Sequence, residues 1–201
     1  TSFPFEWHFH DAFEITLIIK GEGQRFVGDS IESYKEGDLV FLPPELAHTW
    51  KSSETSQENE AIYIQFDRDC IGKGTFEIDD FRELYELINS KQGFVFKYDE
   101  KVAEYLVRCL SESGIDRLIY FFKILKRLSL LEKQSLASIS YETEKDEESR
   151  GMMDKLMGLL NNDSAMQVPE IAVQLNMSES TFRRFIKKNT GRSFVDFTNL
   201  M

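Results

Sequence analysis

The first third of the chain alternates between short apolar runs and turn-forming residues. Four runs rich in Phe, Ile, Val and Tyr, the residues that β-strands favour, cover residues 13–19, 24–27, 38–42 and 61–66. Clusters of Gly, Asp, Glu and Ser separate these runs, as at residues 20–23. Strands this short and this closely spaced predict a β-barrel or a β-sandwich.

The spacing of apolar residues changes after the first third. They recur at the three- and four-residue intervals of amphipathic helices over residues 81–88, 102–110 and 118–131. The third of these helices is apolar on most of its faces, so we expect it to pack either in the core or against a second copy of the chain. A polar, Glu-rich stretch follows at 132–149, and another amphipathic helix is predicted over 153–160.

Charge is distributed unevenly along the 201 residues, whose formal net charge is −11. Residues 1–150 carry 18 basic and 30 acidic side chains, whereas residues 151–201 carry 6 and 5. Binding to a polyanion requires Lys and Arg, so a nucleic-acid partner is compatible only with the C-terminal part. The chain shows neither a membrane-spanning apolar run nor a signal-peptide pattern, and its two cysteines lack metal or redox spacing. We therefore expect a cytoplasmic protein without a membrane segment.

The most specific signal is a helix-turn-helix pattern in the C-terminal part. Pro169 suits the first turn of a helix, where its missing N–H costs nothing. Asn176 follows where a tight turn needs a left-handed residue, and Ser178 can cap the next helix with its hydroxyl. Small Ala172 and apolar Phe182 complete the spacing, because a small residue lets the two helices cross closely.

The second helix of this pattern presents polar and basic residues on its outer face. Guanidinium groups there can reach the O6 and N7 atoms of guanine in the major groove of DNA. The candidate DNA-contacting residues are Ser180, Thr181, Arg183, Arg184, Lys187 and Lys188. An ordinary helical hairpin with a basic solvated face is the alternative, which the turn chemistry and the spacing disfavour.

Residues 166–194 resemble the first helix-turn-helix of AraC-type transcription regulators, the AraC/XylS family. The residues that match the family pattern are Ser178, Phe182, Arg184, Lys187, Thr190 and Gly191. The resemblance implies that Ser180, Arg183 and Arg184 face bases and that Lys187 and Lys188 contact phosphates. The family carries a second helix-turn-helix, and the sequence ends before it. We therefore expect a truncated chain that binds DNA weakly.

All three histidines belong to one pattern. His8, His10 and Glu14 are followed by His48, with the glycines and the proline of the spacings H-x-H-x3-E-x6-G and G-x5-P-x4-H. These two boxes resemble those of cupins over residues 5–66. The resemblance implies a site in which the three histidines and the carboxylate hold Fe, Mn, Ni or Zn.

Three interpretations of the histidine pattern remain open. A functional metal would make the protein a metal-dependent cupin enzyme, a dioxygenase or an isomerase, in which the ion polarises a substrate oxygen. The resemblance to AraC-type regulators favours a metal-free pocket for a small effector such as a sugar. That pocket would be lined by His8, His10, Glu14, His48 and Trp50, with Trp7, Phe41 and Tyr63 as further candidate walls. In the third interpretation the histidines serve only the structure.

These patterns together predict an α+β protein. A cupin-like, effector-sensing β-barrel is expected at residues 1–70 and a helical dimerisation and linker region at 71–140. An acidic linker is expected at 141–150, and the first half of an AraC-type DNA-binding domain at 151–201. We expect a ligand-responsive transcription regulator, not an enzyme, that acts as a homodimer. Its expected partners are double-stranded DNA and a small-molecule effector, and no cofactor is expected unless a divalent metal occupies the histidine site.

Overall fold

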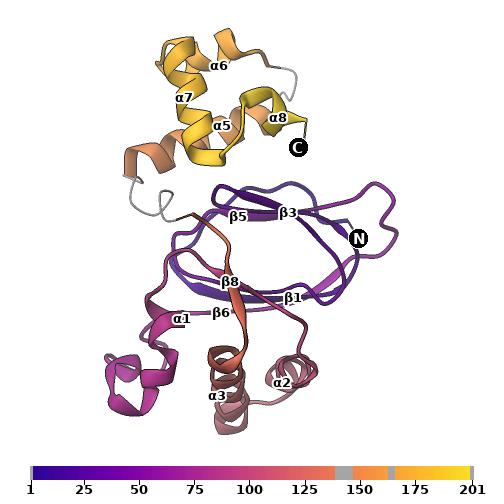
Figure 1. Cartoon of the computed structure of the whole chain (residues 1–201), viewed down its shortest axis with the longest axis vertical. Helices are drawn as coiled ribbons and strands as arrows, with labels where there is room; N and C mark the ends of the chain where they lie inside the picture. Colours follow the sequence, from indigo (N-terminus) through magenta and orange to yellow (C-terminus); the bar gives the residue numbers. More distant parts are fainter. Residues whose placement is uncertain (1, 139–146, 163–165, 200–201) are drawn as a thin grey trace.

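The computed structural model describes residues 2–138, 147–162 and 166–199. Two antiparallel sheets face each other in its N-terminal part (Figure 1). The larger sheet has the strand order β6-β1-β4-β7-β8, and the smaller has the order β3-β2-β5. The strands are β1 (Phe13–Lys20), β2 (Gly23–Val27), β3 (Ser30–Tyr34), β4 (Leu39–Leu42), β5 (His48–Ser52), β6 (Glu60–Phe66), β7 (Phe94–Phe96) and β8 (Lys133–Ser135).

Helices cover the outer faces of both sheets (Figure 1). Helices α2 and α3 lie against the larger sheet, and helices α5 to α8 lie over the smaller one. The helices are η1 (Thr75–Glu77), η2 (Asp79–Leu84), α1 (Tyr85–Asn89), α2 (Glu100–Ser111), α3 (Gly114–Leu130), α5 (Glu147–Asn162), α6 (Val168–Gln174), α7 (Glu179–Thr190) and α8 (Phe194–Thr198).

Strand β1 separates the core from the space between the sheets. Phe13, Ile15 and Leu17 belong to the apolar cluster that also contains α2 and α3. Glu14 lies on the opposite side, because successive side chains of a strand point to opposite faces. The register places Glu14 beside Leu42 of β4 and Gln65 of β6. One strand therefore contributes both to the core and to the space between the sheets.

Helix α2 begins at a residue that is both its cap and an ion-pair partner. Asp99 accepts a hydrogen bond at 3.0 Å from the backbone N–H of Val102. Both of its carboxylate oxygens also accept hydrogen bonds from Arg127 of α3, the shortest at 2.7 Å. The Arg127 guanidinium holds the pKa of Asp99 below its ordinary value. Asp99 thus joins α2 to α3.

We expect Asp99→Ala to lower the free energy of unfolding by about 1–2 kcal/mol, since the loss of an N-cap alone costs about 1 kcal/mol. Asp99→Asn keeps an acceptor for the cap and should cost less. Because the folded pKa of Asp99 lies below the unfolded value, its charge stabilises the protein above the unfolded pKa. This stabilisation is lost as the pH falls through the folded pKa. Urea unfolding of the three proteins at neutral and acidic pH measures both effects, and equal stabilities at neutral pH would contradict the prediction.

The structure confirms the predicted α+β class and corrects its details. Strands β1, β2, β4 and β6 lie where the sequence predicts them, and β3 and β5 are additional. Strands β7 and β8 lie within the segment expected to be helical, and they extend the larger sheet from β4. The described strands form two separate sheets, so the strand pairing does not close into the single β-barrel that the cupin resemblance implied. Strands of three residues are too short to show a hydrophobic period, which explains why β7 and β8 were not predicted.

The smaller sheet and the C-terminal helices share one apolar cluster. Phe26 of β2 and Trp7 belong to it, together with Leu156 of α5 and Phe197 of α8. The ring of Phe5 lies 4.9 Å from that of Phe26 and 6.2 Å from that of Phe197, measured between centroids. The N-terminal segment, residues 2–12, therefore packs between this sheet and α8 through Phe5 and Trp7.

The predicted acidic linker lies mostly outside the described residues. Its described part begins at Glu147, which is the first residue of α5. The predicted division of the chain into domains stays a prediction. Within the described residues, the structure has no helix of the length and apolarity needed to cross a membrane.

Candidate functional site

A pocket of about 370 Å³ lies between the two sheets. Inward-facing side chains of β1 and β6 form one wall, and β5 and the N-terminal segment form the other. The lining residues are Phe3, Pro4, Glu6, His8, Glu14, Thr16, Ile18, Thr49, Trp50, Ala61, Tyr63 and Gln65. A mostly apolar pocket of this size with a few convergent polar groups is typical of sites for small organic molecules.

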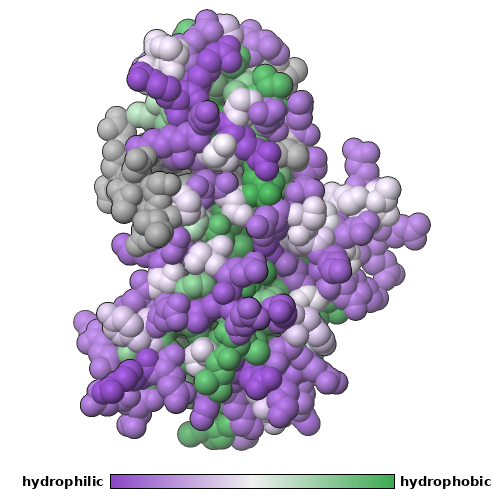
Figure 2. All heavy atoms as spheres, in the orientation of Figure 1, coloured by the Kyte–Doolittle hydropathy of each residue, from purple (hydrophilic) through white to green (hydrophobic). Residues whose placement is uncertain are grey.

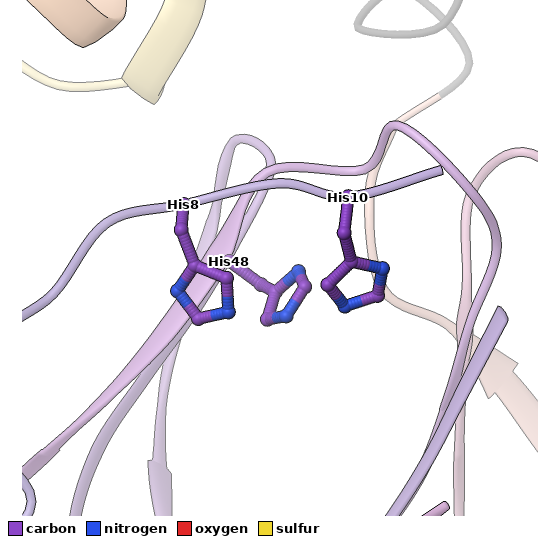
Figure 3. A group of neighbouring side chains, drawn as sticks. All are labelled: His8, His10 and His48. Carbon is purple, nitrogen blue, oxygen red and sulfur yellow. The ribbon is translucent and has the colours of Figure 1, made fainter. Parts of the chain in front are cut away.

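Three histidines converge beside this pocket (Figure 3). One ligand nitrogen of each ring lies within 4.8 Å of the others. Each Nδ1 hydrogen-bonds a backbone carbonyl two residues away, at 2.7–2.9 Å: His8 to Glu6, His10 to Ala12 and His48 to Leu46. A carbonyl oxygen only accepts, so Nδ1 must carry the proton. In the neutral ring, Nε2 then has a free lone pair.

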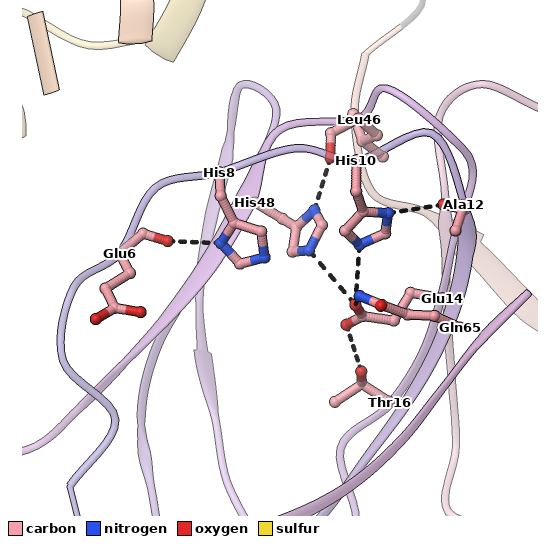
Figure 4. Close-up of polar contacts among 9 residues, drawn as sticks. All are labelled: Glu6, His8, His10, Ala12, Glu14, Thr16, Leu46, His48 and Gln65. Atoms are coloured by element: carbon pink, nitrogen blue, oxygen red, sulfur yellow. Dashed lines mark hydrogen bonds and ion pairs between the residues drawn. The ribbon is translucent and has the colours of Figure 1, made fainter. Parts of the chain in front are cut away.

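Glu14 is the acidic partner of these histidines (Figure 4). Its Oε2 lies 3.0 Å from His10 Nε2 and 3.8 Å from His48 Nε2, and it accepts a hydrogen bond from Gln65 at 3.0 Å. Its Oε1 accepts a hydrogen bond from the Thr16 hydroxyl at 2.6 Å. Burial raises the pKa of Glu14, but contacts with His48, Thr16 and Gln65 outweigh it and hold this pKa well below its ordinary value.

The four side chains fit a divalent transition-metal ion. The Nε2 atom of His48 is buried and has no hydrogen-bond partner among the residues that the structure describes, which is rare for a buried polar atom. Two donors bound to one ion at about 2.1 Å, at roughly 90–109° to each other, lie about 3.0–3.4 Å apart. The Nε2 atom of His10 and Oε2 of Glu14 have that separation, 3.0 Å. With a neutral ring, these two facing lone pairs need a proton or a cation between them.

The surroundings of the cluster also suit metal ligation. Burial lowers the pKa of His8, which favours the neutral ring that a ligand must have. The hydrogen bonds from each Nδ1 to a carbonyl are of the kind that orients metal-bound imidazoles. An ion held by His8, His10, Glu14 and His48 would act as a Lewis acid toward an oxygen atom of a molecule in the pocket.

The predicted effector residues lie in one region. His8, Glu14 and Trp50 line the pocket itself. His10 and His48 contact Glu14 in the adjoining cluster. Whether a small molecule binds these five residues stays a prediction.

Other pocket residues were harder to predict. Tyr63 lines the pocket, but Trp7 packs with the C-terminal helices and Phe41 packs in the core. Thr16 and Gln65 were missed, although both hydrogen-bond Glu14. The alternation of side chains along β1 could have identified Thr16 from Glu14. Gln65 could not be found in this way, because its place depends on the register between β1 and β6.

The predicted helix-turn-helix consists of α6, a turn and α7. Asn176 has a φ of 54°, the left-handed conformation that its place in the sequence predicts. Asn176 and Met177 donate backbone hydrogen bonds to Val173 and Ala172, at 3.0 and 2.8 Å. These two bonds form the Schellman motif that ends a helix. The hydroxyl of Ser178 then caps α7 by accepting the N–H three residues on.

The outer face of α7 carries all the predicted DNA-contacting residues. Its inner face is buried through Phe182, Phe185 and Ile186, which join the C-terminal apolar cluster. Arg183 and Glu179 are 3.8 Å apart and more than half exposed, so their pairing is weak. The exposed residues of this face are Ser180, Thr181, Arg183, Arg184, Lys187 and Lys188.

Comparison with known proteins finds similarities for the N-terminal part of the chain. The profile of the AraC-like ligand binding domain matches residues 1–69. Gentisate 1,2-dioxygenase from Haloferax sp is 39% identical over 41 residues, which are 20% of this chain and only 12% of that enzyme.

Two solved structures resemble the fold. ToxT from Vibrio cholerae aligns over 100% of this chain and 94% of its own, with a TM-score of 0.46 and 10% identity. The AraC-like transcriptional activator CuxR aligns over 94% of this chain and 65% of its own, with a TM-score of 0.41 and 12% identity. The match of the AraC-like ligand binding domain covers the segment that bears the histidines, residues 1–69, and confirms the predicted AraC-type resemblance there.

Proposed function

We propose that the chain is a ligand-responsive transcription regulator, in which a small molecule binds between the two sheets and α7 contacts double-stranded DNA. One observation carries this proposal. An AraC-like ligand-binding domain with a pocket and a helix-turn-helix with a cationic outer face occur on the same chain. Such a regulator acts where the genome is accessible, so a cytoplasmic location belongs to the proposal.

Helix α7 has the chemistry required to read the major groove. Arg183 and Arg184 are exposed, and each guanidinium can donate two hydrogen bonds to one guanine. Lys187 and Lys188 lie one turn further along and suit phosphates, which a point charge binds without base preference. The chain as a whole has a net charge of −11, which repels DNA elsewhere and favours an approach through α7.

The N-terminal segment, residues 2–12, connects the pocket to the C-terminal helices. Glu6 and His8 line the pocket, whereas Phe5 and Trp7 pack in the cluster that contains α5 and α8. A molecule that moves Glu6 or His8 therefore also acts on the residues that hold Phe197. We expect the effector to shift the population of arrangements of the C-terminal helices, which is how ligand binding at one site changes affinity at another.

Selection from a randomised duplex DNA library tests the proposal directly. The chain is immobilised, bound duplexes are recovered over several rounds, and their sequences are compared. A shared motif is the expected result, and recovery of random sequences would contradict base reading. A thermal-shift screen with sugars and other small metabolites tests the second half, because a true effector raises the Tm with its concentration.

A homodimer is also part of the proposal, and α3 carries the observation behind it. The sequence predicted that α3 packs either in the core or against a second copy of the chain. Phe121 and Leu125 bury their side chains in the core. Ile115, Leu118 and Ile119 share another face of the helix and are 73%, 39% and 45% exposed. Figure 2 shows apolar residues gathered over this part of the molecule. A second copy of the chain would bury this face.

We expect Ile115→Lys/Ile119→Lys to convert the dimer into a folded monomer. Both side chains are largely exposed in one copy of the chain, so charges there cost little stability except across an interface. Sedimentation equilibrium measures the change in mass, and circular dichroism confirms the fold. Ile78→Lys is the control, because Ile78 is 50% exposed but precedes η2 and lies outside α3. A wild-type chain that is already monomeric would contradict the dimer.

A metal-dependent enzyme is the second candidate function. The cluster of three histidines and Glu14, and the 41-residue similarity to gentisate 1,2-dioxygenase, favour it. Oxygen uptake by the Fe²⁺-loaded chain in the presence of gentisate tests this alternative. The regulator proposal predicts no turnover.

A further inference from the structure

The metal-compatible side chains come from three separate parts of the fold. Glu14 belongs to β1 of the larger sheet, and His48 begins β5 of the smaller sheet. His8 and His10 belong to the N-terminal segment. We infer that the cluster binds one divalent transition-metal ion, and that this ion clamps the N-terminal segment onto both sheets.

The protein alone holds this segment by separate hydrogen bonds and by the packing of Phe5 and Trp7, not by continuous strand pairing. The backbones of His8 and His48 exchange hydrogen bonds of 2.8 and 3.2 Å, and the Ser52 amide donates to the Phe3 carbonyl at 3.0 Å. The described residues before β1 form only a single-residue bridge and no continuous strand. An ion with two ligands from this segment and one from each sheet acts as a cross-link, so it suppresses detachment of the segment.

The donor set selects the class of ion. Three imidazoles and one carboxylate suit borderline ions such as Fe²⁺, Co²⁺, Ni²⁺ and Zn²⁺, whereas Mg²⁺ and Ca²⁺ prefer sites made of oxygen atoms. The side chains that line the pocket include the acidic Glu6 and Glu14 but no Lys or Arg. A bound ion therefore also supplies positive charge that these side chains lack.

The clamp has a regulatory consequence, which rests on the proposed function, whereas the metal binding does not. Phe5 and Trp7 alternate with the residues that face the cluster, and they pack with Phe197 of α8. Fixing His8 and His10 fixes these aromatic residues as well. Metal binding thus stabilises the described arrangement of α8 on the smaller sheet, and metal loss releases it.

Titration of the full chain with Co²⁺ tests the clamp, because Co²⁺ absorbs visible light according to its ligands. We expect one ion per chain by elemental analysis and a visible spectrum of an imidazole-coordinated ion. Hydrogen exchange, followed by mass spectrometry, should slow for the amides of residues 3–12. At an ion concentration 100 times the Kd, opening that releases the ion should fall roughly 100-fold. Mg²⁺ should produce neither change.

Matched variants separate this site from other binding. Glu14→Gln and His10→Gln each remove a ligand and should weaken Co²⁺ binding by at least about tenfold. Glu6→Gln makes the same chemical change on the other pocket carboxylate, which points away from the histidines in Figure 4, and should bind Co²⁺ like the wild type. If a ligand variant does not fold, two measurements on the wild-type chain decide whether the ion binds this cluster. These are the visible spectrum with Co²⁺ and the faster hydrogen exchange of residues 3–12 after a chelator removes the ion.

The outcomes are distinct. A wild-type chain that binds neither Co²⁺ nor Zn²⁺ overturns the site. A folded Glu14→Gln variant that binds Co²⁺ as tightly as the wild type also overturns it, because the bound ion is then an adventitious ion only. Slowed exchange without any change in affinity for the selected DNA overturns the regulatory step. Failure to select any DNA counts against the proposed function and leaves the metal result standing.

Discussion

Replacing both Arg183 and Arg184 by Ala is expected to remove sequence-specific DNA binding at concentrations that saturate the wild-type chain. One bidentate contact between an arginine and a guanine contributes about 1–3 kcal/mol to base discrimination. Two lost contacts therefore weaken binding by roughly 30-fold or more. Both side chains are exposed, and neither belongs to the apolar cluster under α7. The free energy of unfolding should therefore not change.

The control for this variant removes the same charge elsewhere. Arg82 and Arg117 are exposed residues of η2 and α3, on the part of the molecule away from α7 in Figure 1. Arg82→Ala/Arg117→Ala should change DNA affinity little, and only through the overall charge. Fluorescence anisotropy with a selected duplex and with a scrambled one measures both affinity and specificity. An equal loss in both double variants would show that α7 does not read bases.

The helix-turn-helix could be predicted because its signals are local. Asn176 marks the turn through its own backbone conformation, and Ser178 caps a helix that starts at the next residue. Neither residue depends on contacts distant in the sequence. The alternation of Phe182 and Phe185 with basic residues then defines which face of α7 is buried. This part of the chain was therefore predictable to within single residues.

The pocket depends on contacts that the sequence does not reveal. The spacing of the histidines in the sequence predicted that His8, His10 and His48 lie close to Glu14, as they do in the structure. Each ring can act as a ligand through Nε2 because its Nδ1 donates a hydrogen bond to a backbone carbonyl. The position of that carbonyl depends on the folded backbone and cannot be predicted from the spacing of the histidines. Strand pairing between β1 and β6, which places Gln65 beside Glu14, is equally non-local. The sequence therefore predicted the ionisable side chains of the cluster and two of the pocket walls, Trp50 and Tyr63, but not Thr16 and Gln65.

Gly23→Ala is expected to lower the free energy of unfolding by about 3 kcal/mol or more, at the upper end of overpacking in a core. A Cβ atom on Gly23 would lie 2.0 Å from the backbone oxygen of Lys51 and 2.9 Å from Cα of Ser52. Both atoms belong to the backbone of β5, so no side-chain rotation relieves the clash. Strand β2 also pairs with β3 on its other side, where Gly23 faces Tyr34. The strands must separate, which breaks hydrogen bonds of the smaller sheet.

A second glycine provides the matched control, because the same methyl group can be added where space is free. Among the described residues, and apart from the adjoining residues and backbone of its own helix, no atom lies within 4 Å of a Cβ placed on Gly158 of α5. Gly158→Ala should therefore stabilise the protein by about 0.5–1 kcal/mol, since Ala favours a helix. If the contacts between β2 and β5 cause the destabilisation of Gly23→Ala, urea unfolding should give changes in the free energy of unfolding of opposite sign for the two variants. A Gly23→Ala variant as stable as the wild type would mean that β2 does not lie against β5 at this position, and the wall of the pocket that carries His48 and Trp50 would then have to be placed differently.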